Sequence, residues 1–216
     1  YWRAFAPLYD VFAVIQKGTF PDELKAIGVE NSLYLPMAAD PDFHKPLELS
    51  SVDRHQYGGD VSFMGAGYPN RRKAFRQLTD FGLKIFGSDW DQDSALESYV
   101  QFGGRRVSSE ETVKIFNAAK INLNLHSSAQ AQDTVAPGDF VNPRTFELAA
   151  CGTFQLVDTR ELMPELFDED QLATFTSMEE LKDMIPKYLA DEGLRDSYAQ
   201  KSRERVLAQH TYVHRM

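Results

Sequence analysis

The stretch "NPRTFELAACGTFQLVD" (142–158) decides the fold, because it begins as a helix and ends as a strand. Asn142 is a typical N-cap, Pro143 suits the first helical position, and Gly152 follows the last helical residue. The apolar run 153–158 then predicts a strand. A helix that returns directly to a strand is typical of one repeat of an α/β sheet.

The same alternation continues on both sides of this stretch. Ser108, with Glu111 three residues later, is a capping signature for the helix at 108–120. The expected strands are 60–65, 83–87, 121–126, 153–158 and 172–176, and the expected helices are 69–82, 108–120, 142–152, 177–190 and 191–209. Strands that alternate with helices predict right-handed βαβ units and therefore a Rossmann-like, doubly wound parallel sheet.

Before this sheet the chain shows a shorter pattern. A strand is expected at 10–15, a helix at 21–28 and a strand at 32–36. The next residues, 37–59, are rich in Pro, Gly and polar side chains, which predicts a linker or hinge. We therefore expect residues 1–57 to be the remnant of a preceding N-terminal domain plus a hinge, and 58–216 to be the α/β domain.

Composition excludes several classes of protein. The 216 residues are 43% hydrophobic and 25% charged, which is ordinary for a globular domain. A net charge of −9 disfavours nucleic acid as a partner. No apolar run is long enough for a transmembrane segment, and there is no signal-peptide pattern. Cys151 is the single cysteine, so an intrachain disulfide is impossible and a cytoplasmic location is expected. The first residue is Tyr1, which suggests a fragment.

A glycine turn follows the strand at 60–65. Ligands of such sheets bind beyond the carboxyl ends of the strands, at helix N-termini. Gly65 and Gly67 permit a tight turn there, and Arg71 and Arg72 lie in the first turn of the next helix. Basic residues at that position oppose the helix dipole, which an anion bound between them would explain. The alternative is a plain strand–turn–helix with solvated arginines.

The helix at 142–152 carries a second candidate site. At about 100° per residue its polar side chains share one face, opposite the apolar face: Arg144, Glu147 and Cys151. Free N–H groups after Asn142 would bind an anion, and Arg144 would add a bidentate phosphate donor. Glu147 could accept hydrogen bonds from a ribose diol. The alternative is a surface ion pair between Arg144 and Glu147 at i, i+3.

The long polar segment 127–141 lies between the strand at 121–126 and this helix, and loops of that length are often functional. Asp139 precedes Glu147 by eight positions (147 − 139 = 8). His126 is expected at the end of its strand, where a lone histidine is more often structural than catalytic. The five histidines are scattered, so no metal site is expected: His44, His55, His126, His210 and His214.

Several segments resemble group 1 glycosyltransferases, and in particular their spore-maturation, CgeB-like branch. These segments are "NPRTFELAACGTFQLVD", "ELMPELF", "HTYVHR", "DVSFMGAGYPNRRKAF", "LKIFGSDW", "INLNLH" and "LYLPMAADPDFHKP". The resemblance implies a GT-B fold of two Rossmann-like domains, whose C-terminal domain holds a nucleotide-sugar donor between two glutamates eight positions apart. Glu147 matches the second glutamate, which contacts the ribose. Asp139 takes the place of the first, and Arg71 matches an arginine that faces the diphosphate.

The resemblance implies sugar transfer from a nucleotide-diphosphate sugar to an unknown acceptor, with no metal or other cofactor and usually with retention. This chain would be the donor-binding half. The acceptor site and any catalytic base would come from the N-terminal domain, so no catalytic residue is assigned and the fragment alone is expected to be inactive. Two alternatives stay open: a non-catalytic nucleotide- or partner-binding module on the same fold, and an epimerase of similar two-domain fold.

Overall fold

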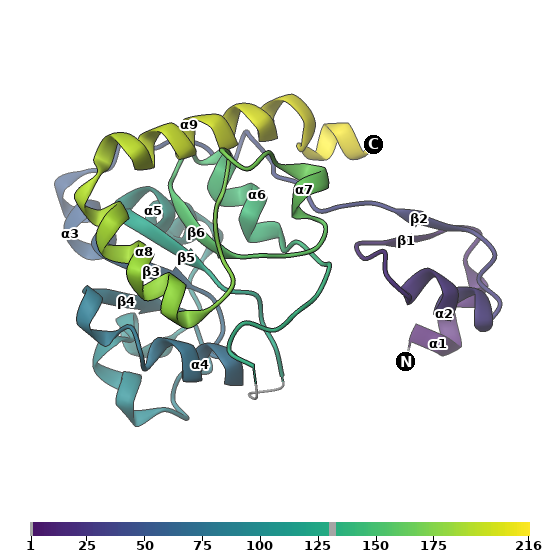
Figure 1. Ribbon diagram of the computed structural model, residues 1–216, viewed down its shortest axis with the longest axis horizontal. Coiled ribbons are helices and arrows are strands. Elements are labelled where there is room, and N and C mark those ends of the chain that lie inside the picture. Colours follow the sequence, from purple (N-terminus) through teal and green to yellow (C-terminus); the bar gives the residue numbers. More distant parts are fainter. Residues whose placement is uncertain (1, 130–132) are drawn as a thin grey trace.

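The main body of the protein is a parallel sheet. The computed structural model describes residues 2–129 and 133–216. Its five-stranded sheet has the order β4-β3-β5-β6-β7 (Figure 1). The strands are β3 (Gly59–Met64), β4 (Leu83–Phe86), β5 (Ala119–Asn124), β6 (Gln155–Asp158) and β7 (Ala173–Phe175). All neighbours pair in parallel, which confirms the predicted fold class.

The strand order reverses beside β3. In register, Phe63 of β3 lies between Ile85 of β4 and Leu123 of β5. The chain moves from β3 to β4 on one side and then continues with β5 on the other side. Such a reversal opens a crevice at the carboxyl ends of the two strands, which is where ligands of open α/β sheets bind. The strand order here therefore predicts such a crevice beyond β3 and β5.

Helices cover both faces of the sheet. Side chains of α4 and α8 pack with Phe63, Leu123 and Leu156 on one face. On the other face α5 and α6 lie against the sheet, with α9 packed on α6 and α3 on α5 (Figure 1). The helices are α3 (Ser51–Tyr57), α4 (Pro69–Phe75), α5 (Ser109–Ala118), α6 (Pro143–Ala150), α7 (Met163–Leu166), α8 (Met178–Ala190) and α9 (Glu192–Gln209), with short 3-10 turns η2 (Thr79–Phe81), η3 (Ser94–Tyr99), η4 (Gln101–Gly104) and η5 (Tyr212–Arg215).

Alternation along β5 sends polar side chains to the α5–α6 face. Asn122 donates to the carbonyl of Phe116 in α5 at 3.1 Å. Asn124 donates to Thr145 Oγ1 in α6 at 3.0 Å and accepts from Asn142 at 2.8 Å. Every one of these contacts is buried, so each hydrogen bond fixes the helices against the sheet more specifically than apolar packing would.

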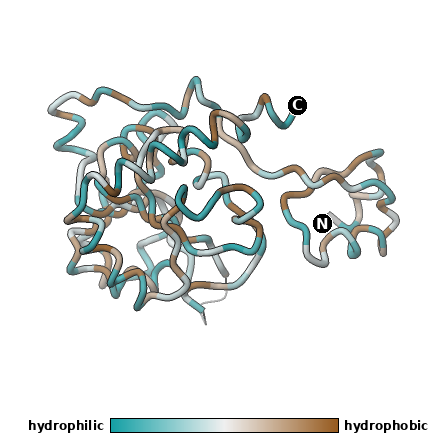
Figure 2. Tube along the Cα trace, turned by 45° about the horizontal axis from the view of Figure 1, so that its top comes forward, coloured by the Kyte–Doolittle hydropathy of each residue, from teal (hydrophilic) through white to brown (hydrophobic). Residues whose placement is uncertain are grey.

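A small lobe precedes the main body. It contains α1 (Trp2–Phe5), η1 (Ala6–Leu8), β1 (Phe12–Val14), α2 (Phe20–Ala26) and β2 (Ser32–Tyr34), with β1 and β2 paired in parallel. Figure 1 shows it set to one side of the sheet. In Figure 2 the hydrophobic segments gather inside the main body, and a smaller set lies in this lobe. The lobe's core is Ala6, Val14, Leu24 and Val29.

Residues 35–50 join the lobe to the main body as an extended strap. Ala39 is fully buried and forms a β-bridge with Thr211. Arg215 donates to the carbonyls of Pro36 and Met37, at 2.9 and 3.0 Å. The strap is therefore packed against the C-terminal end of the chain.

Three local predictions differ from the structure. The segment expected to be loop through residue 59 contains α3, where Ser50 caps the helix by accepting from the N–H of Asp53. The helix expected at 69–82 ends at Phe75, because i→i+3 bonds tighten the chain and turn the fully buried Leu78 into the core. The strand expected at 121–126 ends at Asn124.

None of the helices in the described residues combines the length and the apolar character that crossing a bilayer needs.

Candidate functional site

A pocket of about 500 Å³ opens at the carboxyl ends of β3 and β4, next to the start of α5. Its lining includes Met64, Gly65, Gly87, Arg106, Ser109 and Arg144. The pocket therefore lies beside the crevice that the strand order defines. Gly65 and Arg144 are the two predicted site residues that line it directly.

Two glycine turns pack back to back beneath this pocket. Gly67 donates its N–H to the carbonyl of Ser88 at 2.9 Å, and a Cβ on Gly67 would lie 2.2 Å from the carbonyl oxygen of Asp89. Gly87 has a φ of 118°, and its Cβ would lie 2.5 Å from the carbonyl oxygen of Gly65. Gly67, which the sequence suggested for close approach to a ligand, is needed for close approach of the neighbouring turn.

The side chain of Arg71, a residue of α4, reaches the segment that follows β5. Its Nε donates to the carbonyl of Leu125 at 2.9 Å, and its Nη1 donates to the carbonyl of Ala66 at 3.1 Å. Burial and the nearby charge of Arg144 lower the pKa of Arg71 to about 10. Among the described residues no carboxylate forms an ion pair with Arg71. Arg72 turns away, toward the carbonyls of Gly67 and Asp89.

Arg144 crosses from α6 to β3. Its Nη1 donates to the carbonyl of Met64 at 2.5 Å, and its guanidinium lies 4.9 Å from the ring centroid of Phe116. Its Nε donates to Glu147 Oε2 at 3.2 Å, and the two side chains are 24% and 20% exposed. The i, i+3 ion pair that the sequence offered as the alternative to a ligand site is thus present. It is partly buried at the edge of the pocket, and the charge of Glu147 adds to burial in raising the pKa of Cys151 to about 12.

The N-terminus of α6 is partly satisfied within the protein. The N–H of Asn142 donates to His126 Nε2 at 2.9 Å, and the N–H of Thr145 donates to Asn142 Oδ1 at 3.1 Å. Pro143 has no N–H. For the backbone N–H of Arg144 no partner is found in the part of the chain that the structure describes. A ligand at this helix end would therefore meet one free backbone donor, fewer than the sequence suggested.

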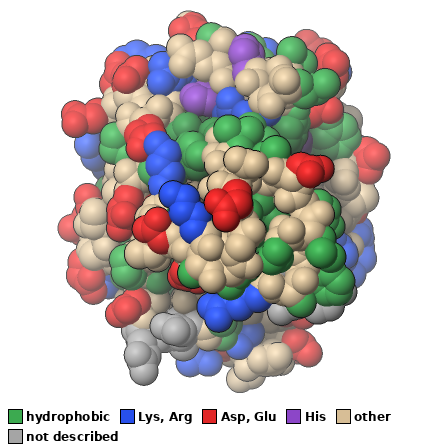
Figure 3. Space-filling view, turned by 90° about the vertical axis from the view of Figure 1, so that its right-hand side faces the viewer, with side chains coloured by type: hydrophobic (Ala, Val, Ile, Leu, Met, Phe, Trp, Pro, Cys, Tyr) green, Lys and Arg blue, Asp and Glu red, His purple; other side chains and the backbone are tan. Residues whose placement is uncertain are grey.

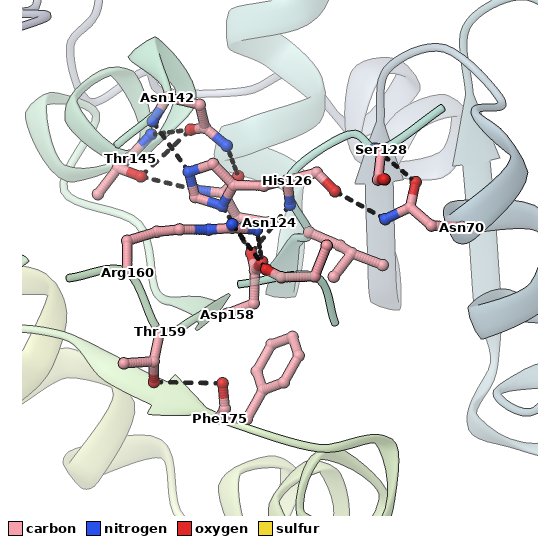
Figure 4. A network of polar contacts seen from close by, with 12 residues as sticks. Asn70, Asn124, His126, Ser128, Asn142, Thr145, Asp158, Thr159, Arg160 and Phe175 are labelled. Atoms are coloured by element: carbon pink, nitrogen blue, oxygen red, sulfur yellow. Dashed lines mark hydrogen bonds and ion pairs between the residues drawn. The ribbon is translucent and has the colours of Figure 1, made fainter. Parts of the chain in front are cut away.

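His126 is buried two residues beyond β5 (Figure 4). Its Nδ1 lies 2.7 Å from Asp158 Oδ1. Because Nε2 accepts the N–H of Asn142, Nδ1 carries the proton and donates to Asp158, and the ring is neutral. Burial lowers the pKa of His126, against the opposing effect of Asp158. His126 therefore holds the start of α6 and does not line the pocket.

Asp139 faces the N-terminal lobe. Its Oδ2 accepts the backbone N–H of Lys17 at 2.7 Å, and the Nζ of Lys17 pairs with Glu165. The structure thus brings Arg71, Arg144 and Glu147 together and places Asp139 at the junction with the lobe. Figure 3 shows that side of the molecule, where basic and acidic side chains are interspersed with apolar ones.

Several residues that line the pocket were not predicted from the sequence: Ser88, Asp89, Arg106, Val107, Ser109 and Thr112. A pattern was available, because "GGRRVSSEE" (103–111) places two arginines directly before a capping box. In the described residues no three His, Cys, Asp or Glu side chains converge as metal ligands.

The family described as glycosyl transferase-like matches residues 54–216, so the chain belongs to this family. Its sequence falls in the CgeB-like branch of group 1 glycosyltransferases: it is 24% identical over 173 residues to the spore protein CgeB of Bacillus subtilis (strain 168), covering 76% of this chain and 52% of that protein. The chain thus spans about half the length of this curated relative. The resemblance found in the sequence is confirmed.

Solved structures agree with the GT-B fold. A sucrose-phosphate synthase from Thermosynechococcus elongatus superimposes with a TM-score of 0.66 at 17% identity, covering 99% of this chain and 57% of that one. HepE from Anabaena, solved in complex with UDP-glucose, gives a TM-score of 0.70 at 13% identity and covers 98% of this chain and 62% of that one. At these identities the likeness shows the fold alone.

Proposed function

We propose that this chain is the donor-binding half of a hexosyltransferase-like glycosyltransferase that uses a nucleotide-diphosphate sugar. Residues 58–216 would hold the donor, and residues 1–57 would belong to the end of the N-terminal domain and the hinge. Two facts support the substrate class. The family is one of glycosyltransferases, and its structural neighbour HepE was solved with UDP-glucose.

The observation that carries the proposal is the pair of arginines at the crevice. Arg71 and Arg144 are close enough for one charge to lower the pKa of the other, and Arg71 has carbonyls as partners in place of a carboxylate. Two like charges held together while partly withdrawn from water are unfavourable unless anions lie beside them. Glu147 pairs with Arg144 and the charge of Asp158 acts on Arg71, but among the described residues no carboxylate forms an ion pair with Arg71, which leaves its guanidinium to a ligand anion. Guanidinium groups bind phosphate oxygens in bidentate fashion, so a diphosphate fits.

The nucleoside would occupy the adjoining pocket. Its volume of about 500 Å³ suits a base and a ribose. Glu147, bonded to Arg144 at the pocket's edge, offers carboxylate oxygens to a ribose diol. The backbone N–H of Arg144 and the helix dipole of α6 add positive potential where the phosphates would lie.

This arrangement can stabilise a leaving group. When the sugar leaves, negative charge develops on the diphosphate, and preorganised guanidinium groups stabilise that charge at little reorganisation cost. Arg71 and Arg144 would supply this effect, with no metal-dependent step and no resident cofactor in the proposal. The acceptor and the group that activates it would be held by the other domain.

Calorimetry with UDP, GDP, ADP, CDP and dTDP tests the proposal. We expect one or more to bind, and Arg144→Ala to weaken that binding by roughly tenfold or more, as for a lost charged hydrogen bond. Arg54→Ala, which removes an exposed guanidinium on α3, is the matched control and should change nothing. If none of the five binds to the folded chain, the proposal is wrong.

One observation favours the alternative of a non-catalytic module. The carboxylate of Asp139, which would contact the donor sugar by family resemblance, already accepts the N–H of Lys17. The same titrations separate the donor-binding half from a module that serves a protein partner, because that module would bind none of the nucleotides.

A further inference from the structure

A buried carboxylate lies at the end of β6, beneath the proposed donor site. Asp158 is fully buried, and its Oδ1 accepts both the backbone N–H of His126 at 2.9 Å and the ring Nδ1–H at 2.7 Å (Figure 4). Its Oδ2 accepts from Arg160. A buried charge is stable only when it is paired and hydrogen-bonded in this way. Asp158 therefore fixes two side chains at once.

The first of these side chains leads to the diphosphate-binding arginine. With Nδ1–H held by Asp158, His126 presents Nε2 as an acceptor, and the N–H of Asn142 donates to it at 2.9 Å. Asn142 is the N-cap of α6, and Arg144 lies in the first turn of that helix. The position of Arg144 thus depends on Asp158 through the imidazole ring of His126.

The second side chain leads to the loop before α6. Arg160 Nη1 donates to the carbonyl of Ala136 at 2.7 Å, two residues before Gly138, whose carbonyl accepts from the N–H of Glu161. In the described part of the chain, Arg160 Nε is the buried side-chain atom left without a hydrogen-bond partner. The buried guanidinium of Arg160 therefore lacks a complete set of hydrogen bonds. It is held by the carboxylate of Asp158 and the carbonyl of Ala136.

We propose that Asp158 is a positioning residue for the nucleotide diphosphate, acting through His126 on the start of α6 and through Arg160 on residues 136–138. It does not touch the ligand. The inference rests on the proposed function, since it names residues that prepare the same site. If these contacts only stabilised the core, removing them would lower the free energy of unfolding but would not change how the affinity for a nucleoside diphosphate depends on pH.

The protonation state of His126 distinguishes a positioning role of Asp158 from a purely structural one. A protonated ring would turn an N–H toward the N–H of Asn142 and break that bond. Asp158 faces the ring and opposes its deprotonation, while Arg160, Arg71 and burial favour the neutral form. As pH falls through the lowered pKa of His126, the start of α6 loses its anchor, and affinity for a diphosphate should fall with it.

His126→Gln and His126→Phe form the test pair, with UDP as the probe. A glutamine carboxamide oxygen can accept the N–H of Asn142 and does not titrate, whereas phenylalanine cannot accept it. At pH 7.5 we expect His126→Gln to bind UDP within about threefold of the original protein and His126→Phe to bind roughly tenfold more weakly, as for an unsatisfied buried N–H. Asp158→Ala, which removes the acceptors of both His126 and Arg160, should resemble His126→Phe.

The same titrations are then repeated from pH 8 to pH 5. UDP itself gains a proton in this range, so the comparison is the ratio of affinities between the original protein and His126→Gln, which should fall at low pH. His55→Gln, which replaces an exposed histidine on α3, should leave that dependence unchanged.

A constant ratio of affinities from pH 8 to pH 5, or equal UDP affinity in His126→Gln and His126→Phe, would overturn the inference alone. If the unmodified chain does not bind UDP, both this inference and the form of the proposed function in which the donor is a uridine nucleotide are overturned. Should Asp158→Ala fail to fold, the His126 pair still decides.

Discussion

Glu147 lies one turn along α6 from the helix start, where its carboxylate accepts from Arg144. Replacing it with Ala should weaken nucleotide binding by roughly 1–3 kcal/mol, the usual size of a hydrogen bond to a charged acceptor. The fold should survive, because Glu147 is not on the apolar face of α6. Calorimetry and thermal unfolding of the same samples check both parts. Unfolding of Glu147→Ala, or unchanged nucleotide affinity, would show that the residue is structural.

At this scale the sequence predicted what depends on helix geometry. The pairing of Arg144 with Glu147, which was the alternative to a ligand site, follows from their i, i+3 spacing, and the N-cap role of Asn142 follows from its position before Pro143. It could not predict that His126 pairs with Asp158, because His126 follows β5 and Asp158 ends β6, and these strands meet only in the folded sheet. Spacing along one chain carries no information about such contacts.

The capping box of α5 adds a pH-dependent contribution at the scale of elements. Glu111 accepts from the N–H of Ser108 at 2.9 Å and pairs with Arg105 at 2.5 Å. The hydrogen bonds from Arg105 and Ser108 lower the pKa of Glu111 from 4.5 to about 2. Because the folded-state pKa is depressed, the stability it contributes is present above about pH 4.5 and is lost as pH falls toward 2.

Chemical denaturation of the original protein and Glu111→Gln should show this dependence. The difference in unfolding free energy should be largest near pH 6 and shrink as the pH approaches 2. Ser108 also caps the helix, so Ser108→Ala should cost about 1 kcal/mol at both pH values. A difference for Glu111→Gln that does not vary with pH would contradict the assigned pairing.

Hydrogen bonds from α4 hold the segment that leads into α6. Asn70, fully buried in α4, donates to the carbonyls of His126 and Thr134 at 2.9 and 3.2 Å and accepts the N–H of Ser128 at 2.9 Å. Amide exchange in 127–129 and 133–141 should slow when donor binds, because these residues flank the helix that receives the phosphates; residues 130–132 lie outside the described residues. Unchanged exchange at saturating nucleotide diphosphate would place the donor elsewhere.

Elements were predicted well where periodicity was long and capped, as for α8 and α9. The helix α3 was missed because its residues lie in a polar, proline-containing stretch, and its burial comes from packing on α5. The early end of α4 was missed because the last residues keep a helical pattern while Leu78 turns into the core. In both cases tertiary packing decided the outcome.

At the scale of the whole molecule, His210 joins three segments. Its Nε2–H donates to the carbonyl of Leu166, and its Nδ1 accepts from Arg215, which also holds the strap at Pro36 and Met37. Burial lowers the pKa of His210 to about 4. Between that value and the unfolded value of 6.5 the unfolded chain binds more protons, so the free energy of unfolding should fall as pH decreases through this range.

His210→Gln keeps a donor and an acceptor but does not titrate. Denaturation curves between pH 7 and pH 4 should show a shallower loss of stability for this variant, with a difference on the order of 1–3 kcal/mol at the lower limit. Parallel curves for the two proteins would mean that His210 does not control how the strap is held.

The central claim is that Arg71 and Arg144 form a diphosphate site. The most direct measurement compares binding of UDP, or of whichever nucleoside diphosphate binds, with binding of the corresponding free nucleoside, in the original protein and in Arg71→Ala and Arg144→Ala. Each substitution should cost more affinity for the diphosphate than for the nucleoside, because a guanidinium that binds phosphate contributes little once the phosphate is absent. Equal losses for the two ligands in both variants would contradict the assignment.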